Sequence, residues 1–218
     1  MDFSISWQRD PFNQIEEDIY LGSRPSPSLV PILKDVGITH VASCLIEEDR
    51  PLVDFLKEDF HPLFVPLHDG IHEDILSTLP TFLDFFEGAQ ASLGRAKVLI
   101  HCEAGVSRSA ALATAFLMKR RRKPFFETYR DVRAKRHEVL PNIGFASQLQ
   151  RFEFDLDLGV SSDTKASSLA RYLHEVCAVP AELEVLQSVL HDQNYDALKA
   201  LQSIFGEEIP RVVQGVRL

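Results

Sequence analysis

Residues 97–109 read KVLIHCEAGVSRS, a buried-strand pattern that runs into a loop and then a helix. The apolar run at its start is typical of a strand buried in the middle of a parallel sheet that helices cover on both faces. Cys102 and Arg108 follow this strand and lie six residues apart. On a continuous helix they would be about 9 Å apart along the axis, too far to hold one small anion together. The segment between them must therefore curl into a loop, which Gly105 permits because glycine tolerates positive φ.

The curled loop predicts an anion-binding site at the amino end of the following helix, where the helix dipole is positive. Its inward-pointing backbone amides would be those of Glu103, Ala104, Gly105, Val106, Ser107 and Arg108. A phosphoryl dianion fits such a site, and the same field favours the nucleophilic thiolate form of Cys102. Arg108 adds a planar fork that holds two phosphate oxygens at once. The alternative is that Cys102 is a small buried residue and Arg108 a surface charge.

The stretch HCEAGVSRS resembles the active-site loop of the protein tyrosine phosphatase superfamily, and its AGVSRS part resembles the dual-specificity branch. The likeness extends to IYLGS, GITHVASCL, RSAALATAFLMK and LPNIGFASQLQRFE. The resemblance implies that Cys102 attacks phosphorus to form a phosphocysteine and that Arg108 stabilises the transferring group. It also implies that Ser109 helps the thiolate depart and that Asp69 protonates the leaving oxygen.

Asp69 lies 33 residues before Cys102, in a loop after an expected strand, where similar phosphatases place their general acid. From the residues alone, any carboxylate on this loop could serve, and Glu73 and Asp74 are competitors. Asp69 could also simply form the turn before Gly70. The resemblance further implies that His101 supports the loop backbone and that Asn142 braces it, with an ordinary polar contact as the alternative for each.

We expect an α/β fold with a central, mostly parallel sheet flanked by helices for residues 10–157, the catalytic domain. A linker at 158–168 and a helical extension at 169–218 would follow, the extension with three short helical patterns, the second starting at Pro180 and ending near Asn194. The expected strands are 18–23, 39–45, 63–67 and 97–101. The expected helices are 26–37, 73–93 (ending at Gly94), 107–122, 126–136 and 143–155, and the acidic run 47–49 is expected to be an exposed loop.

The helical extension faintly resembles a three-helix ubiquitin-associated module, which would imply ubiquitin or another protein as a partner. That family usually carries a Met-Gly-Phe-like first loop, whereas this chain has Cys177-Ala178-Val179-Pro180. We therefore favour an appendage that packs on the catalytic domain.

The formal net charge of −9 argues against nucleic acid as a partner. No apolar run is long enough to cross a membrane and no leader or lipidation signal is visible, so we expect no membrane partner and a cytoplasmic location. The basic run 119–123 (KRRRK) could be a docking patch or a nuclear targeting signal, and the signal would extend the expected location to the nucleus. We favour the interpretation that it is the solvated end of a helix. Three widely spaced cysteines fit a reducing compartment and exclude a zinc cluster. We expect Cys44 to pack in the core rather than to act as a redox partner of Cys102.

The resulting hypothesis is hydrolysis of phosphotyrosine, and of phosphoserine or phosphothreonine, in protein substrates, with no cofactor and no metal. One alternative keeps the fold but acts on a phosphoinositide or a phosphoglucan. The absence of basic residues among Glu103, Ala104, Val106 and Ser107 disfavours a polyphosphorylated headgroup. The other alternative is an inactive phosphoprotein-binding module.

Overall fold

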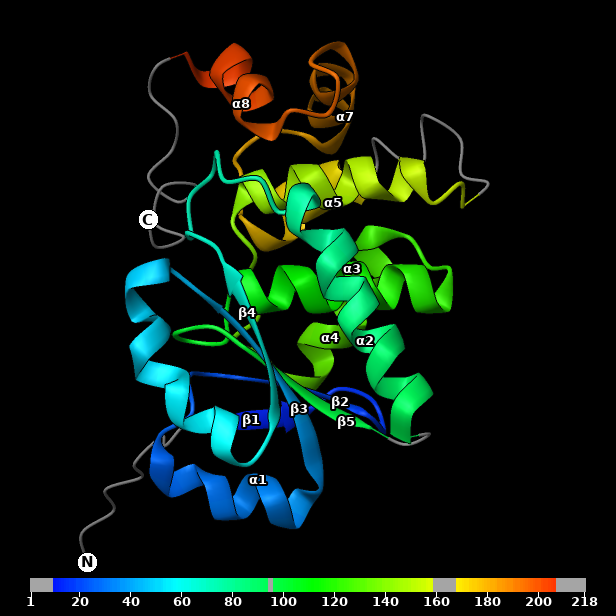
Figure 1. Ribbon diagram of the computed structural model, residues 1–218. Helices are drawn as coiled ribbons and strands as arrows, with labels where there is room; N and C mark the ends of the chain where they lie inside the picture. The colour runs from blue at the N-terminus through cyan, green and yellow to red at the C-terminus, as the bar shows by residue number, and fades with distance from the viewer. Residues whose placement is uncertain (1–9, 94–95, 159–167, 207–218) are drawn as a thin grey trace, which may run out of the picture.

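The computed structural model describes residues 10–93, 96–158 and 168–206, and in these residues five strands form one sheet (Figure 1). The strands are β1 (Phe12–Gln14), β2 (Ile19–Gly22), β3 (Ile38–Leu45), β4 (His61–Pro66) and β5 (Lys97–His101). Their order across the sheet is β1-β2-β5-β3-β4. Only β1 runs antiparallel to its neighbour. The predicted parallel sheet with β5 at its centre is confirmed; the short edge strand β1 was not predicted.

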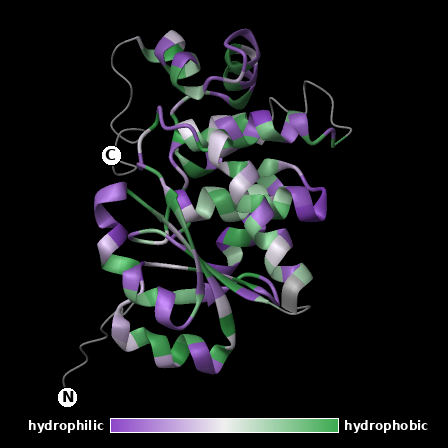
Figure 2. Ribbon diagram, in the orientation of Figure 1, coloured by the Kyte–Doolittle hydropathy of each residue, from purple (hydrophilic) through white to green (hydrophobic). Residues whose placement is uncertain are grey.

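Helices cover both faces of the sheet. On one face lie α1 (Val30–Val36) and the 3-10 segment η2 (Glu47–Glu58), and on the other lie α2 (Leu79–Leu93), α3 (Arg108–Arg121), α4 (Phe125–Lys135) and α5 (Ile143–Asp155). Side chains alternate along β5, so that Leu99 packs in one hydrophobic cluster and Val98 and Ile100 in the other. The strands are coloured mainly as hydrophobic in Figure 2, as expected for a sheet buried on both faces.

In the α/β part of the chain, two expected helix starts and one expected loop were wrong. The helix expected from residue 73 begins at Leu79, after the 3-10 turn η3 (Leu76–Thr78), because the preceding segment is bound to α5: the side chain of Gln148 accepts the backbone N–H of Ile75 at 2.9 Å. The helix expected from residue 26 begins at Val30, after η1 (Pro27–Leu29), although it ends at Gly37 as predicted. The acidic run 47–49 is not a loop but the first turn of η2, where the helix dipole favours carboxylates.

The C-terminal helical segments pack on the α/β part of the chain. They are the π-helical turn η4 (Tyr172–Val176), α7 (Leu183–Asp192) and α8 (Ala197–Phe205), with α7 and α8 lying over α5 in Figure 1. The buried side chains of Leu169, Tyr172 and Leu201 belong to the same hydrophobic cluster as the inner face of α3. The expected packing is confirmed, but the second helix begins at Leu183 rather than Pro180, after an extended residue at its N-cap.

The domain boundaries stay predictions, since most of the expected linker and residues 207–218 lie outside the described residues. Gly94, the expected end of the helix from residue 73, lies outside them too. In the ranges that are described, no helix combines the length and hydrophobicity needed to span a bilayer.

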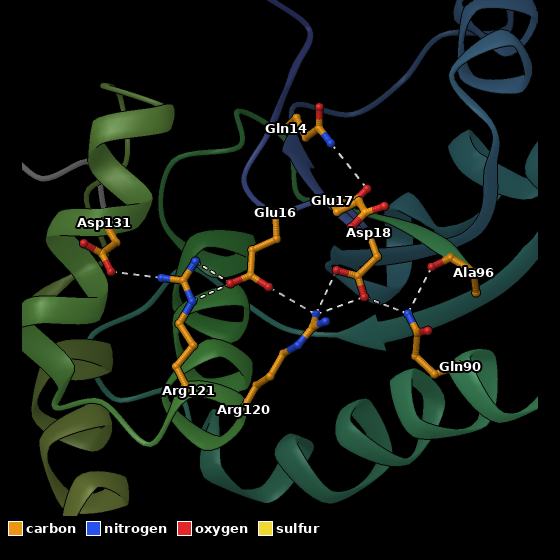
Figure 3. A network of polar contacts seen from close by, with 9 residues as sticks. All are labelled: Gln14, Glu16, Glu17, Asp18, Gln90, Ala96, Arg120, Arg121 and Asp131. Carbon is orange, nitrogen blue, oxygen red and sulfur yellow. Dashed lines mark hydrogen bonds and ion pairs between the residues drawn. The ribbon is translucent and has the colours of Figure 1, made fainter. Parts of the chain in front are cut away.

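The basic run at the carboxyl end of α3 is held by acidic residues of neighbouring segments (Figure 3). The pairs are Lys119–Glu87 at 2.8 Å, Arg120–Asp18 at 2.8 Å, Arg121–Asp131 at 2.9 Å, Lys123–Asp131 at 3.0 Å and Arg121–Glu16. The network ties the end of α3 to the connection between β1 and β2 and to α4. The run is thus more than a solvated helix end, and its use as a targeting signal stays a prediction.

Candidate active site

The loop between β5 and α3 is shaped by one glycine. Gly105 has φ +68°, a conformation that L side chains rarely adopt. A Cβ atom at this position would lie 2.4 Å from the carbonyl carbon and oxygen of Gly22, at the end of β2. Both the backbone conformation and the close approach of β2 therefore require glycine here.

The carbonyl groups of the loop are held from outside by distant residues. The backbone N–H of Arg24 donates to the carbonyl oxygen of Glu103 at 3.1 Å, and that of Leu140 donates to the carbonyl oxygen of Val106 at 2.8 Å. Between them, the guanidinium of Arg136 donates to the carbonyl oxygens of Ala104 at 3.3 Å and Gly105 at 3.0 Å.

These contacts fix the direction of the loop amides. In a planar trans peptide the N–H points opposite to the preceding C=O, and the described residues contain no cis peptide. Four consecutive carbonyls, those of residues 103–106, are bound from outside the loop. The amides of residues 104–107 are therefore turned the other way, toward the interior of the loop, as an anion-binding nest requires.

The sulfur of Cys102 lies inside this loop. It accepts hydrogen bonds from the backbone N–H of Gly105 at 3.2 Å and from the hydroxyl of Ser109 at 3.1 Å. Cys102 is 2% exposed, at the start of the turn into α3. Two hydrogen-bond donors, one from the loop and one from α3, therefore converge on the sulfur.

Arg108, the first residue of α3, is buried beside the loop. Its Nη1 donates to the carbonyl oxygen of Leu67 at 3.3 Å, which anchors one edge of the guanidinium. Its Nε is fully buried and has no hydrogen-bond partner among the described residues. A buried, unpaired N–H of a permanent cation is costly in a folded protein and marks this arginine as a candidate for anion binding.

His101 supports the loop from the last position of β5. Its Nδ1 lies 3.4 Å from the carbonyl oxygen of Cys102, and its Nε2 lies 2.7 Å from the hydroxyl oxygen of Ser43 on β3. Complete burial lowers the pKa of His101 to about 4, so the ring is neutral at pH 7. Since a carbonyl can only accept, Nδ1 carries the proton and the hydroxyl of Ser43 donates to Nε2.

Asp69 is joined to the loop by hydrogen bonds. Its Oδ1 accepts from the hydroxyl of Ser107 at 2.5 Å and from the side-chain amide of Asn142 at 3.0 Å. The backbone N–H of Asn142 in turn donates to the hydroxyl oxygen of Ser107 at 3.1 Å. Ser107 stands at the N-cap of α3 without capping it, because its hydroxyl binds Asp69 instead. Asp69, Ser107 and Asn142 thus form one connected unit.

Among the described residues, neither competing carboxylate, that of Glu73 or that of Asp74, forms a hydrogen bond with the cysteine loop. The side chain of Asp74 accepts the backbone N–H of Ser77 at 3.2 Å, and the carbonyl oxygen of Glu73 accepts from Gln148 at 2.7 Å. Of the three candidate acids, the hydrogen bonds connect only Asp69 to the cysteine loop. Its catalytic role stays a prediction.

Two arginines of the site were missed from the sequence. Arg24 forms a two-bond ion pair with Glu103, at 2.7 and 3.2 Å, and this hydrogen bonding lowers the pKa of the Glu103 carboxyl. Arg136 is 2% exposed and also binds the side chain of Asn13 at 2.7 Å. No local motif distinguishes either arginine from a surface cation, since their partners are backbone carbonyls or residues far away in the sequence.

The other two cysteines differ from Cys102. Cys44 is completely buried in the core, as expected, and burial raises its pKa well above the ordinary value. Burial likewise raises the pKa of Cys177 to about 12. Among the described residues, no group of three or more His, Cys, Asp or Glu side chains could hold a metal ion.

A thiol enclosed by inward amides, with a buried arginine at the start of the next helix, makes a candidate anion-binding site around a cysteine on an α/β sheet. The family model described as "Dual specificity phosphatase, catalytic domain" matches residues 19–155. The chain belongs to this family.

Individual relatives agree with this assignment. Human dual specificity protein phosphatase 16 is 39% identical over 64% of this chain and 20% of its own length. Human dual specificity protein phosphatase 12 is 35% identical over 81% of this chain and 51% of its own length. The chain thus spans about half or less of these two curated relatives.

The solved structures share the fold. The crystal structure of the human tyrosine phosphatase-like serine/threonine/tyrosine-interacting protein has a TM-score of 0.62 and 29% identity, covering 66% of this chain and 96% of that one. Human DUSP28 has a TM-score of 0.59 and 29% identity, covering 67% of this chain and 95% of its own. These matches confirm the predicted fold class.

Proposed function

We propose that this chain is a protein phosphatase that hydrolyses phosphotyrosine, and phosphoserine or phosphothreonine, through a phosphocysteine intermediate without a metal. The observation that carries this proposal is the loop around Cys102. Its four outward-held carbonyls direct the intervening amides toward the sulfur side, where a tetrahedral anion would meet the positive end of α3. Membership of the dual specificity phosphatase family supports it.

In the first step, Cys102 Sγ attacks phosphorus, an S–P bond forms and the bond from phosphorus to the substrate oxygen breaks. Asp69 protonates that leaving oxygen, and Arg108 and the loop amides hold the phosphoryl oxygens. In the second step, water attacks phosphorus, Asp69 accepts a proton from it, and the S–P bond breaks. The hydroxyl of Ser109, 3.1 Å from the sulfur, stabilises the departing thiolate.

The test is turnover of a small aryl phosphate in the presence of a chelator. Cys102→Ser is expected to abolish measurable turnover, and Cys177→Ser, which changes a buried cysteine far from the loop in sequence, is expected to retain it. Asp69→Asn is expected to lower kcat by about 10²- to 10³-fold, in line with the usual contribution of a general acid. Near-normal activity of Cys102→Ser would overturn the mechanism, whereas a normal rate for Asp69→Asn would overturn only the assignment of the acid.

The substrate class is tested separately with phosphopeptides and phosphoinositides. Among the loop residues between Cys102 and Arg108, the charged one is Glu103, which forms an ion pair with Arg24. Since Arg24 is neutralised by this pair, it is not a free cation for the additional phosphates of a phosphoinositide. Phosphate release from phosphotyrosyl and phosphothreonyl peptides should exceed release from phosphoinositides. A preference for the lipids would contradict the proposed protein substrates while leaving the mechanism intact.

A further inference from the structure

A polar groove of about 530 Å³ lies beside the active site, between the loop that carries Asp69, helix α5 and the C-terminal helix α8. Ile71 and His72 form one wall, only two and three residues after Asp69. Gly144 adjoins this wall so closely that a Cβ atom there would lie 1.9 Å from the carbonyl oxygen of Ile71. The groove therefore starts where the general-acid loop meets the amino end of α5.

Hydrogen bonds hold the three walls together. The side chain of Gln148 on α5 accepts the backbone N–H of Ile75 at 2.9 Å and donates to the carbonyl oxygen of Glu73 at 2.7 Å, so the acid loop is fixed to α5. On the other side, the hydroxyl of Ser147 accepts the backbone N–H of Ala197 at 3.1 Å, which fixes the first turn of α8 to α5. The groove is preformed, and a preformed site binds without a large ordering cost.

The charge of the groove is opposite to that of the whole chain. Its lining carries the cations Arg151 and Lys199 against one carboxylate, Asp196, which lies 3.5 Å from the ammonium of Lys199. Arg151 is exposed and has no carboxylate partner among the described residues, unlike the paired arginines at the end of α3. An unpaired guanidinium in a groove on a chain of net charge −9 is a local site of attraction for anions.

We propose that this groove binds acidic residues that flank the phosphorylated residue of a protein substrate, an inference that rests on the proposed function. A peptide whose phosphate lies in the Cys102 loop passes the Asp69 loop as it leaves the site, and the groove opens directly behind that loop. Arg151 and Lys199 then contact carboxylates of the peptide. Because α8 lies beyond the residues 19–155 that match the family, this recognition site is made partly by a segment outside the matched domain.

The experiment compares matched phosphotyrosyl peptides whose flanking residues, on either side, are glutamate, glutamine or lysine. The wild-type chain should show a kcat/KM about three- to tenfold higher for the glutamate peptide than for the glutamine peptide, mainly through KM, and 0.5 M salt should remove the difference. Arg151→Glu should abolish this preference and favour the lysine peptide. Its rate on a small aryl phosphate, which cannot reach the groove, should stay unchanged.

Arg130→Glu is the matched control, since Arg130 on α4 is exposed, lies outside the groove lining and also has no carboxylate partner in the described part of the chain. It should leave the peptide preference intact. Equal effects of the two substitutions, or a wild-type chain that does not distinguish the peptides, would overturn the groove assignment. If the wild-type chain does not hydrolyse the aryl phosphate, the proposed function is wrong. Peptide binding measured by fluorescence anisotropy then tests the groove separately. A preference for the glutamate peptide that is lost in Arg151→Glu supports the groove assignment, and equal binding of the peptides overturns it.

Discussion

The cysteine loop, residues 102–108, and the C-terminal helices, residues 168–206, reach the residues around Asn142 from two sides. From the loop, Ser107 accepts the backbone N–H of Asn142. From the C-terminal side, the hydroxyl of Tyr172 donates to the carbonyl oxygen of Pro141. Ser107 binds this segment within a cluster of polar groups, whereas Tyr172 binds it from within the hydrophobic core.

The two regions are held in position by different interactions. The loop buries little apolar surface of its own, so its shape depends on one glycine conformation and on hydrogen bonds from Arg24, Arg136 and Leu140. The C-terminal helices depend on burial of side chains such as Leu169 and Leu201. Single substitutions should therefore affect activity more steeply in the loop than in the C-terminal helices.

Among substitutions that alter the shape of the loop rather than the nucleophile, Gly105→Ala is expected to have the largest effect. The new Cβ would strain a backbone with φ +68° and meet the backbone of Gly22 at 2.4 Å, which has no flexible end to move away. We expect kcat/KM on an aryl phosphate to fall about 10³-fold, equivalent to about 4 kcal/mol of transition-state stabilisation. Gly88→Ala, on an exposed face of α2 with nothing within 4 Å of the new atom, should leave activity unchanged. Similar activities for both variants would show that the loop tolerates displacement.

Arg136→Gln tests whether the shape of the cysteine loop depends on the hydrogen bonds that Arg136 donates to the loop carbonyls. The substitution removes charged hydrogen bonds to the carbonyl oxygens of Ala104 and Gly105 and leaves buried acceptors unpaired. We expect a loss of about 3 to 4 kcal/mol in the free energy of unfolding and of about 10²-fold in kcat/KM. Urea unfolding and steady-state kinetics measure the two losses. Lys135→Gln, the exposed neighbour, should change neither, and an active Arg136→Gln variant would contradict the role of this arginine.

The neutral state of His101 predicts a pH dependence of stability. Burial lowers its pKa to about 4, whereas in the unfolded chain it titrates near its ordinary 6.5. Between these values the unfolded chain binds a proton that the folded chain does not, so stability falls as the pH decreases from 6.5 to 4 and does not change through this residue above 6.5. The loss should reach about 2 to 3 kcal/mol by pH 4.5.

The measurement is urea unfolding at pH 7 and pH 4.5 for the wild type and His101→Gln. The variant should lose less stability between the two pH values, while His137→Gln, which changes an exposed histidine, should behave as the wild type. Identical pH dependence of the wild type and His101→Gln would show that this histidine is not the group responsible.

The two regions also differ in what the sequence could predict. The strand, the loop and the glycine were predicted because they occupy consecutive residues whose spacing permits few conformations. Arg136 and Arg24 were not, since a buried arginine that binds backbone carbonyls has no local pattern. The early start assigned to α2 was wrong because Gln148, far away in the sequence, holds the segment before it. Long-range polar contacts, rather than helix or strand periodicity, account for these differences.

The smallest effect, and the one that tests the comparison most directly, is expected for Tyr172→Phe. The substitution keeps the ring in the core and removes only the hydroxyl that donates to the carbonyl oxygen of Pro141. An unpaired buried carbonyl should cost about 1 to 2 kcal/mol of unfolding free energy. Because Pro141 precedes Asn142, which binds Asp69, we expect kcat to fall severalfold on a substrate whose leaving group needs protonation.

The control for this substitution is Tyr20→Phe, since Tyr20 is also buried but its hydroxyl makes no hydrogen bond within the described residues. A second control is the choice of leaving group. An aryl phosphate with a very acidic phenol needs little protonation, so Tyr172→Phe should slow it less than a phenyl phosphate if the defect acts through Asp69. Equal slowing of the two substrates would place the effect in the phosphate loop itself, and no slowing would mean that the C-terminal helices stabilise the fold without positioning the acid.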